Sequence, residues 1–159
     1  MEKIITINDK EFKQCAAPFQ RAYVSRDGWV ITVRTNGTVC DPRQGRINIH
    51  SGHAIRPNAR ITEVPTEPYY TDKGRLCHSK KMNIGQALLY AWVGTPEEAG
   101  KDAWGNLRNT VDHINGNPFD NRLENVRWAS YKEQSLNTRK PVKCKDFTIH
   151  NDFEQFMEE

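Results

Sequence analysis

The sequence lacks a long hydrophobic run. Hydrophobic residues fill only 36% of the 159 positions, and no stretch reaches the roughly 20 predominantly apolar residues that a membrane-spanning helix needs. The opening residues, MEKIITINDK, are charged early and contain no apolar segment of the kind found in secretory signals. We therefore expect a cytoplasmic protein with a small core and no membrane partner.

Cysteine is scarce and widely spaced. The four cysteines are Cys15, Cys40, Cys77 and Cys144, so no pair has the Cys-x-x-Cys spacing of zinc fingers and ribbons. We therefore expect no structural zinc. In a cytoplasmic protein these side chains would normally remain free thiols, because that compartment is reducing.

The net charge of +3 is small, but it is unevenly distributed. Residues 146–159 hold five of the 20 acidic residues and no Lys or Arg, which leaves 15 acidic residues against all 23 Lys and Arg in the rest of the chain. A basic body with an acidic tail favours a polyanionic partner. Ordinary surface solubility explains the same charges about equally well.

Residues 1–94 have the pattern of a β-rich module. Asn36-Gly37 lies between two β-rich runs and predicts a hairpin, as does Asp72-Lys73-Gly74. GRINIH alternates with a period of two residues, and the segment from Gly45 to Pro68 is expected to form loops and edge strands. The first predicted helix begins after Asn83 and stops at Gly94, and its apolar stripe consists of Ile84, Ala87, Leu88, Ala91 and Trp92.

After a polar connector at residues 95–110, residues 111–140 predict a strand, a turn-rich loop, a second strand and a helix. Ser130 and Glu133 form the pattern of a capping box at the start of this helix, and Pro141 would stop it. Residues 141–159 are a basic linker followed by the acidic tail. The expected fold class is α+β.

A strand, strand and helix in this order bring the end of the first strand close to the first turns of the helix. Asp112 offers a carboxylate there, and Gln134 and Asn137 offer amide oxygens, which are ligand types for Mg²⁺ or Mn²⁺. His113 points to the opposite strand face, where a neutral imidazole could deprotonate water. The alternative is structural: Asn, Asp, Gly and Pro are common turn residues, and a lone His beside an Asp often has no chemical role.

Three segments, DHINGN, DNRLENVRW and KEQSLN, match in order and spacing the ββα-metal, or HNH, motif. The chain thus resembles phage and intron-encoded HNH homing endonucleases, closely from Val111 to Arg139 and loosely from Phe19 to Gly94. The resemblance implies a small N-terminal antiparallel β-sheet module with a helix, followed by a ββα-metal nuclease core. It also implies hydrolysis of DNA phosphodiester bonds with one Mg²⁺ or Mn²⁺.

The resemblance assigns roles by position. Asp112 matches the first metal ligand, His113 the general base, and Asn125 the central Asn that pins the loop and orients the His. The helical ligand falls at Gln134, where many relatives have Asn or His, so Asn137, one turn further on, is the alternative ligand.

Double-stranded DNA is the expected partner, in the cytoplasm of a phage-infected bacterial host. The sequence leaves nicking and double-strand cutting both open; we favour a monomer, whose single site would more naturally nick one strand. Candidate DNA contacts, each also explained by an ordinary solvated cation, are Arg127, Arg139, Lys140, Lys143, Arg34 and Arg46.

Two other functions fit parts of the pattern. Gln134 is compatible with an HNH-derived DNA-binding protein that is catalytically weak or inactive. The oxygen-rich loop is compatible with a calcium-stabilised structural domain, although no Gly occupies the sixth loop position counted from Asp112, as an EF-hand requires. The DNA target is not encoded in any recognisable pattern.

Overall fold

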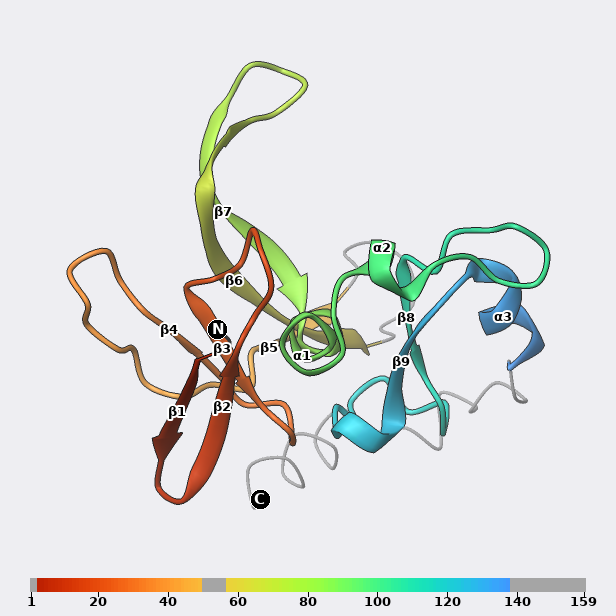
Figure 1. Ribbon diagram of the computed structural model, residues 1–159, viewed down its shortest axis with the longest axis horizontal. Helices are drawn as coiled ribbons and strands as arrows, with labels where there is room; N and C mark the ends of the chain where they lie inside the picture. Colours follow the sequence, from red (N-terminus) through yellow and green to blue (C-terminus); the bar gives the residue numbers. More distant parts are fainter. Residues whose placement is uncertain (1–2, 50–56, 138–159) are drawn as a thin grey trace.

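The computed structural model describes residues 3–49 and 57–137 and has an α+β architecture (Figure 1). The first sheet is antiparallel with strand order β1-β2-β3-β4, formed by β1 (Ile4–Ile7), β2 (Lys10–Gln14), β3 (Ala22–Ser25) and β4 (Val30–Thr32). The turn predicted at Asn36-Gly37 is present, since the Arg34 backbone N–H donates to the Thr38 carbonyl at 2.9 Å. Gly37 has φ +87°, a conformation that Gly adopts without strain.

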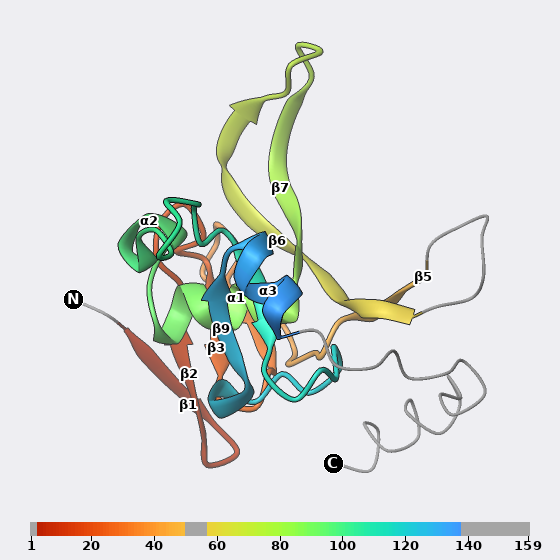
Figure 2. The ribbon, with the colours of Figure 1, turned by 90° about the vertical axis from the view of Figure 1, so that its right-hand side faces the viewer.

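The second sheet has the order β5-β6-β7, with β5 (Arg46–Ile49), β6 (Pro57–Tyr70) and β7 (Leu76–Asn83). The outer parts of β6 and β7 form a long hairpin that projects from the rest of the molecule (Figures 1 and 2). Its tip is the predicted turn, in which the Thr71 N–H donates to the Arg75 carbonyl at 2.9 Å.

The long strand β6 corrects the expectation of loops and edge strands between Gly45 and Pro68. β6 runs for 14 residues and contains three prolines. Its pairing with β7 becomes irregular between Pro65 and Tyr69, and prolines are tolerated in strands at such irregularities, where no N–H is needed for the ladder. The cross-strand partners of β6, which are distant in sequence, therefore override its local loop signals.

Helix α1 (Ile84–Trp92) lies at the centre of the molecule (Figure 1). The Asn83 side chain caps it by accepting the Gln86 N–H at 2.8 Å, and Gly94 lies just past its end, as predicted. The main buried cluster joins α1 residues such as Leu88 to Val24 and Val64 of the two sheets. Val126 and Trp128 belong to the same cluster, so residues on both sides of the predicted 95–110 connector share one core.

The C-terminal part contains α2 (Pro96–Ala99), β8 (Thr110–His113), the short 3₁₀ helix η1 (Leu123–Asn125), β9 (Val126–Ala129) and α3 (Tyr131–Leu136). Strands β8 and β9 form a separate antiparallel pair in which Asp112 lies opposite Arg127. The predicted capping box at Ser130 and Glu133 is present at the start of α3.

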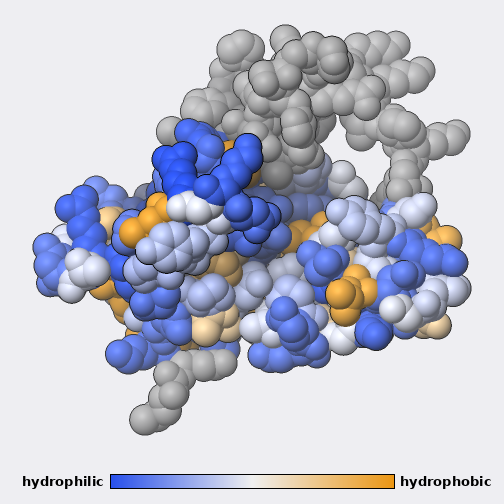
Figure 3. All heavy atoms as spheres, turned by 90° about the horizontal axis from the view of Figure 1, so that it is seen from above, coloured by the Kyte–Doolittle hydropathy of each residue, from blue (hydrophilic) through white to orange (hydrophobic). Residues whose placement is uncertain are grey.

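In the view of Figure 3, the face formed by the described residues is mainly hydrophilic, with small, scattered apolar areas, as the mean hydropathy of −0.80 suggests. Among the described residues, no helix is long and apolar enough to cross a membrane. The predictions for Arg139, Lys140, Lys143, Pro141, Cys144 and the acidic tail fall outside the described residues.

Candidate functional site

The loop between β8 and β9 is built by asparagine side chains. Buried Asn125 donates from Nδ2 to the Asp120 carbonyl at 2.8 Å, and its Oδ1 accepts the Asn115 N–H at 2.9 Å. The Oδ1 atoms of Asn115 and Asn117 accept the backbone N–H groups of Asn117 and Phe119. Turn formation thus accounts for much of the Asn-rich sequence, and it occupies oxygens that a calcium-stabilised loop would require.

Asp112, near the end of β8, is buried, and its side chain is 8% exposed. Asn137 at the C-cap of α3 places its Nδ2 at 3.1 Å from both carboxylate oxygens. Arg127, the cross-strand neighbour, donates from Nε to Oδ2 at 2.9 Å. One carboxylate, one amide and one guanidinium from three elements therefore meet at this point.

The two predicted helical ligands are placed differently. Asn137 contacts Asp112, whereas the Gln134 amide nitrogen donates to the hydroxyl of Thr110 and to the Val111 carbonyl, the latter at 3.1 Å. Gln134 thereby fastens α3 to the beginning of β8. Of the two alternatives, Asn137 has the better position for sharing an ion with Asp112.

His113 is held by a residue that the sequence did not single out. Its Nε2 is 2.8 Å from Oδ1 of the buried Asn121. Because an amide oxygen can only accept a hydrogen bond, this arrangement puts the ring proton on Nε2 and leaves a lone pair on Nδ1. The direct partner of the ring is therefore Asn121, while Asn125 holds the loop; DNRLEN contains both residues, but nothing in it distinguishes their tasks.

Burial of the His113 ring lowers its pKa below the ordinary 6.5. The Asn121 hydrogen bond and the charges of Asp112 and Asp120 act in the opposite direction but do not outweigh burial. The imidazole is consequently neutral near pH 7, the state required of a proton acceptor.

Two glycines, Gly85 and Gly28, allow neighbouring segments to approach this site closely. A Cβ added at Gly85, in the first turn of α1, would lie 2.8 Å from Cγ1 of Val111 and 3.4 Å from Oδ1 of Asn121. A Cβ at Gly28 would lie 3.0 Å from Cβ of Asn121. The residue that orients His113 is thus fixed by the core as well as by its own loop.

The described DNA-contact candidates are accessible to different degrees. The Arg127 side chain is 50% exposed although it is paired with Asp112, so a phosphate can approach it. Arg34 and Arg46 are exposed. Arg34 follows β4 and Arg46 begins β5, so both are distant in sequence from the β8–β9 pair.

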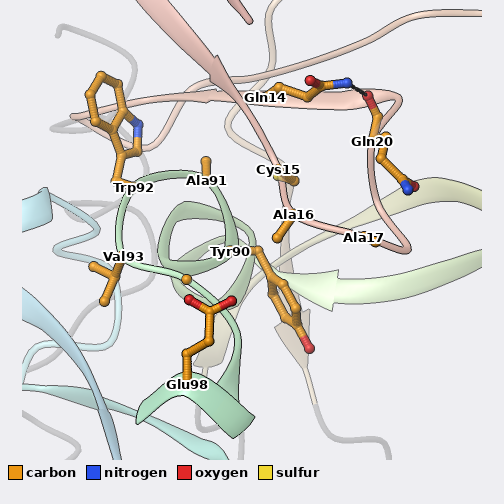
Figure 4. A pocket seen from close by; sticks show the side chains of 11 residues that line it. Gln14, Cys15, Ala16, Ala17, Gln20, Tyr90, Ala91, Trp92, Val93 and Glu98 are labelled. Atoms are coloured by element: carbon orange, nitrogen blue, oxygen red, sulfur yellow. Dashed lines mark hydrogen bonds between the residues drawn. The ribbon is translucent and has the colours of Figure 1, made fainter. Parts of the chain in front are cut away.

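A separate hollow of about 330 Å³ lies beside the C-terminal end of α1 (Figure 4). Its lining includes Cys15, Tyr90 and Glu98 but none of the predicted site residues. Burial raises the pKa of the Cys15 thiol to about 12, so the thiol stays protonated at neutral pH and is a poor nucleophile. This hollow offers no chemistry comparable to that of the β8–β9 site.

Asp112 offers oxygen ligands for a hard cation that retains much of its water, whereas Asn137 and Arg127 present N–H groups to the carboxylate. Within residues 3–49 and 57–137, no three His, Cys, Asp or Glu side chains are grouped to hold a metal. Mg²⁺ is commonly held by one or two carboxylates, with waters and substrate phosphates at its other positions. Asp112 and Asn137 would meet this smaller requirement if the Asn137 amide turned its Oδ1 to the ion and Arg127 shared or released the carboxylate.

Comparison with protein-family models, curated proteins and solved structures finds no match to this chain.

Proposed function

We propose that the protein is a metal-dependent DNA endonuclease of the HNH type. The observation that supports the proposal most is that Asn137 Nδ2 lies 3.1 Å from the Asp112 carboxylate. The next residue in β8, His113, is half-buried, and its ring is oriented by Asn121. The enzyme would hydrolyse phosphodiester bonds of double-stranded DNA. It would act as a monomer that nicks, in the cytoplasm of a phage-infected bacterial host.

Asp112 and Asn137 would hold one Mg²⁺ or Mn²⁺. When bound, the cation would stabilise negative charge on the phosphate as a Lewis acid. The Asn137 amide now presents Nδ2 to the carboxylate, and a half-turn about its last side-chain torsion would present Oδ1 in its place. The two orientations of an Asn amide have nearly the same shape, and the hydrogen-bonding groups around the amide decide between them.

His113 would take a proton from the attacking water through Nδ1. Asn121 would keep the ring in its tautomer and orientation throughout, since its Oδ1 faces Nε2 at 2.8 Å. Asn125 would preserve the loop that carries Asn121, through its bonds to Asn115 and the Asp120 carbonyl. General-base assistance of this kind contributes about 10²–10⁴-fold to the rate.

Nicking of supercoiled plasmid tests the proposal. We expect cleavage with Mg²⁺ or Mn²⁺, loss of cleavage in EDTA, and a fall of about 10²–10⁴-fold in His113→Ala. His78→Ala is the matched control, because His78 is exposed on β7, outside the β8–β9 pair and α3. Undiminished cleavage by His113→Ala, or by the wild type in chelator, would contradict the proposal.

A DNA-binding protein with weak or no catalysis is the second candidate. Its support is the Arg127 guanidinium, which already neutralises the Asp112 carboxylate at 2.9 Å, together with Gln134 at the position of the helical ligand. DNA binding without cleavage in Mg²⁺, Mn²⁺ or any other divalent cation would favour this candidate over the nuclease.

A further inference from the structure

Helix α3, which presents Asn137 to Asp112, has no buried face that could hold it in place by packing. It has six residues, Tyr131–Leu136, and none of them is buried. Isolated helices shorter than about 12–15 residues are marginal in water, and most helices in proteins are stabilised by packing of an apolar face. Polar contacts to neighbouring segments must therefore set where α3 lies.

The most deeply buried of these contacts comes from the loop at residues 100–108. Ser130, the N-cap of α3, is fully buried, and its hydroxyl donates to Asp102 Oδ2 at 2.5 Å. The Asp102 carboxylate is fixed in turn by the backbone N–H groups of Trp104 at 2.9 Å and Asn106 at 2.8 Å. Burial alone would raise the pKa of Asp102, but these hydrogen bonds outweigh it and lower the pKa to about 2.

The same loop contacts the first turn of α3 at two more points. Arg108 donates from Nε to Glu133 Oε1 at 3.0 Å and from Nη1 to the Ala99 carbonyl at 3.2 Å. The ammonium group of Lys132 lies 4.5 Å from the centre of the Trp104 ring. Loop 100–108 therefore grips the N-terminal end of α3, while Gln134 and Asn137 contact β8 from the other end.

We propose that Asp102 is a positioning residue: by holding Ser130, it places α3 so that Asn137 meets Asp112. The functional consequence rests on the proposed nuclease function, whereas the placement of α3 does not. A carboxylate accepts hydrogen bonds more strongly than an amide, so Asp102→Asn weakens the grip on Ser130 while keeping the size of the side chain. Loss of a group that contacts a metal ligand directly typically lowers metal affinity by about 10–100-fold, and Asp102, which acts through Ser130, should have an effect towards the lower end of that range.

The first experiment titrates the full chain with Mn²⁺. The apparent Kd for Mn²⁺ should rise by up to about 10-fold in Asp102→Asn and in Ser130→Ala. The double variant should bind Mn²⁺ no more weakly than whichever single variant binds it less tightly. Plasmid cleavage by Asp102→Asn should return towards the wild-type rate at saturating Mn²⁺, whereas that of His113→Ala should not. Because a metal that binds the folded state also stabilises it, thermal unfolding without metal is measured alongside, and Asp102→Asn should remain folded at the assay temperature.

The matched control is Glu63→Gln. Glu63 also accepts a serine hydroxyl, from Ser79 at 2.6 Å, but it lies on the β6–β7 hairpin. Its removal should leave the Kd for Mn²⁺ unchanged. An unchanged Kd in both Asp102→Asn and Ser130→Ala, or a cleavage defect that saturating Mn²⁺ does not repair, would overturn the proposal.

The second experiment needs no metal. In ¹H–¹⁵N spectra of the metal-free protein, Asp102→Asn should shift the backbone signals of Gln134 and Asn137 and the Asn137 side-chain amide, and Glu63→Gln should not. Unmoved signals in Asp102→Asn would overturn the positioning role. If the wild type neither binds Mn²⁺ nor cleaves DNA, the nuclease function fails, and these spectra still decide whether Asp102 places α3.

Discussion

Arg127 and a divalent cation would compete for the same carboxylate. The guanidinium binds Asp112 Oδ2 at 2.9 Å, and Oδ1 faces Asn137. An incoming cation must therefore share Asp112 with Arg127 or displace it. Since half of the Arg127 side chain is exposed, it has room to move towards a DNA phosphate.

Arg127→Gln should consequently bind Mn²⁺ more tightly and DNA more weakly. Loss of one phosphate contact lowers the slope of log affinity against log salt by about one. Calorimetric titration with Mn²⁺ and DNA-binding isotherms at several salt concentrations measure the two effects, with Lys73→Gln at the hairpin turn as a charge-matched control. Weaker Mn²⁺ binding in Arg127→Gln would contradict the competition.

Asn121→Ala should impair the His113 side of the site without affecting the Asp112–Asn137 side. Without Oδ1 at 2.8 Å from Nε2, the His113 ring loses its orientation, and cleavage should fall by up to the 10²–10⁴-fold that a general base contributes. The Kd for Mn²⁺ should not change, because Asp112 and Asn137 lie on the other face of β8. A parallel loss of Mn²⁺ affinity would show that Asn121 supports both faces.

At the scale of elements, local chemistry predicted the beginnings of helices better than it predicted strands. Asn83 and the Ser130–Glu133 pair cap α1 and α3 as expected, since a cap depends on neighbours within three residues. β6 was missed because its prolines are local loop signals, while its pairing with β7 is visible only in three dimensions.

The candidate site shows the same division. The spacing of Asp112, His113 and Asn125 was enough to predict that a carboxylate, an imidazole and a structural Asn occur around one loop. It was not enough to choose between Gln134 and Asn137, because that choice depends on where loop 100–108 holds α3. Asn121 was missed because the turn chemistry of the loop makes its asparagines look alike in sequence.

Asp102 should also make the protein sensitive to acid. Its folded-state pKa, about 2, lies below the ordinary 3.8, so its stabilising contribution is complete above pH 3.8 and is lost as the pH falls towards 2. The free energy of unfolding should therefore drop less between pH 4 and pH 2 in Asp102→Asn than in the wild type. Denaturant titrations across this range measure the difference, and parallel pH curves for the two proteins would contradict it.

At the scale of the whole molecule, the close approach of α1 to β8 joins the site to the core. Alanine at Gly85 would favour the helix itself by less than the gain of about 1 kcal/mol that it brings at an interior helix position, because Gly85 lies in the first turn. Its Cβ would nevertheless lie 2.8 Å from Val111 Cγ1, and overpacking of this kind costs about 1–3 kcal/mol. The β-branched Val111 side chain has few ways to move aside.

Gly85→Ala should therefore lower the melting temperature and, by shifting β8, reduce cleavage. Adding Val111→Ala removes the Cγ1 methyl group with which the new Cβ clashes, so it should restore part of the cleavage. It also reduces the apolar surface in the core. Thermal unfolding and plasmid nicking of the single and double variants measure both effects. A Gly85→Ala protein that is as stable and as active as the wild type would show that α1 and β8 can separate without consequence.

Trp128 of β9 packs in the central cluster with Leu88 and donates from Nε1 to the Gly94 carbonyl at 2.9 Å. An excised peptide that runs from β8 to α3 would forfeit these partners, and a lone two-stranded hairpin is marginal in water. The segment from β8 to α3 is therefore not expected to fold on its own when it is moved into another protein. Recombination that grafts it onto another protein would have to bring α1 and its flanking sheets as well.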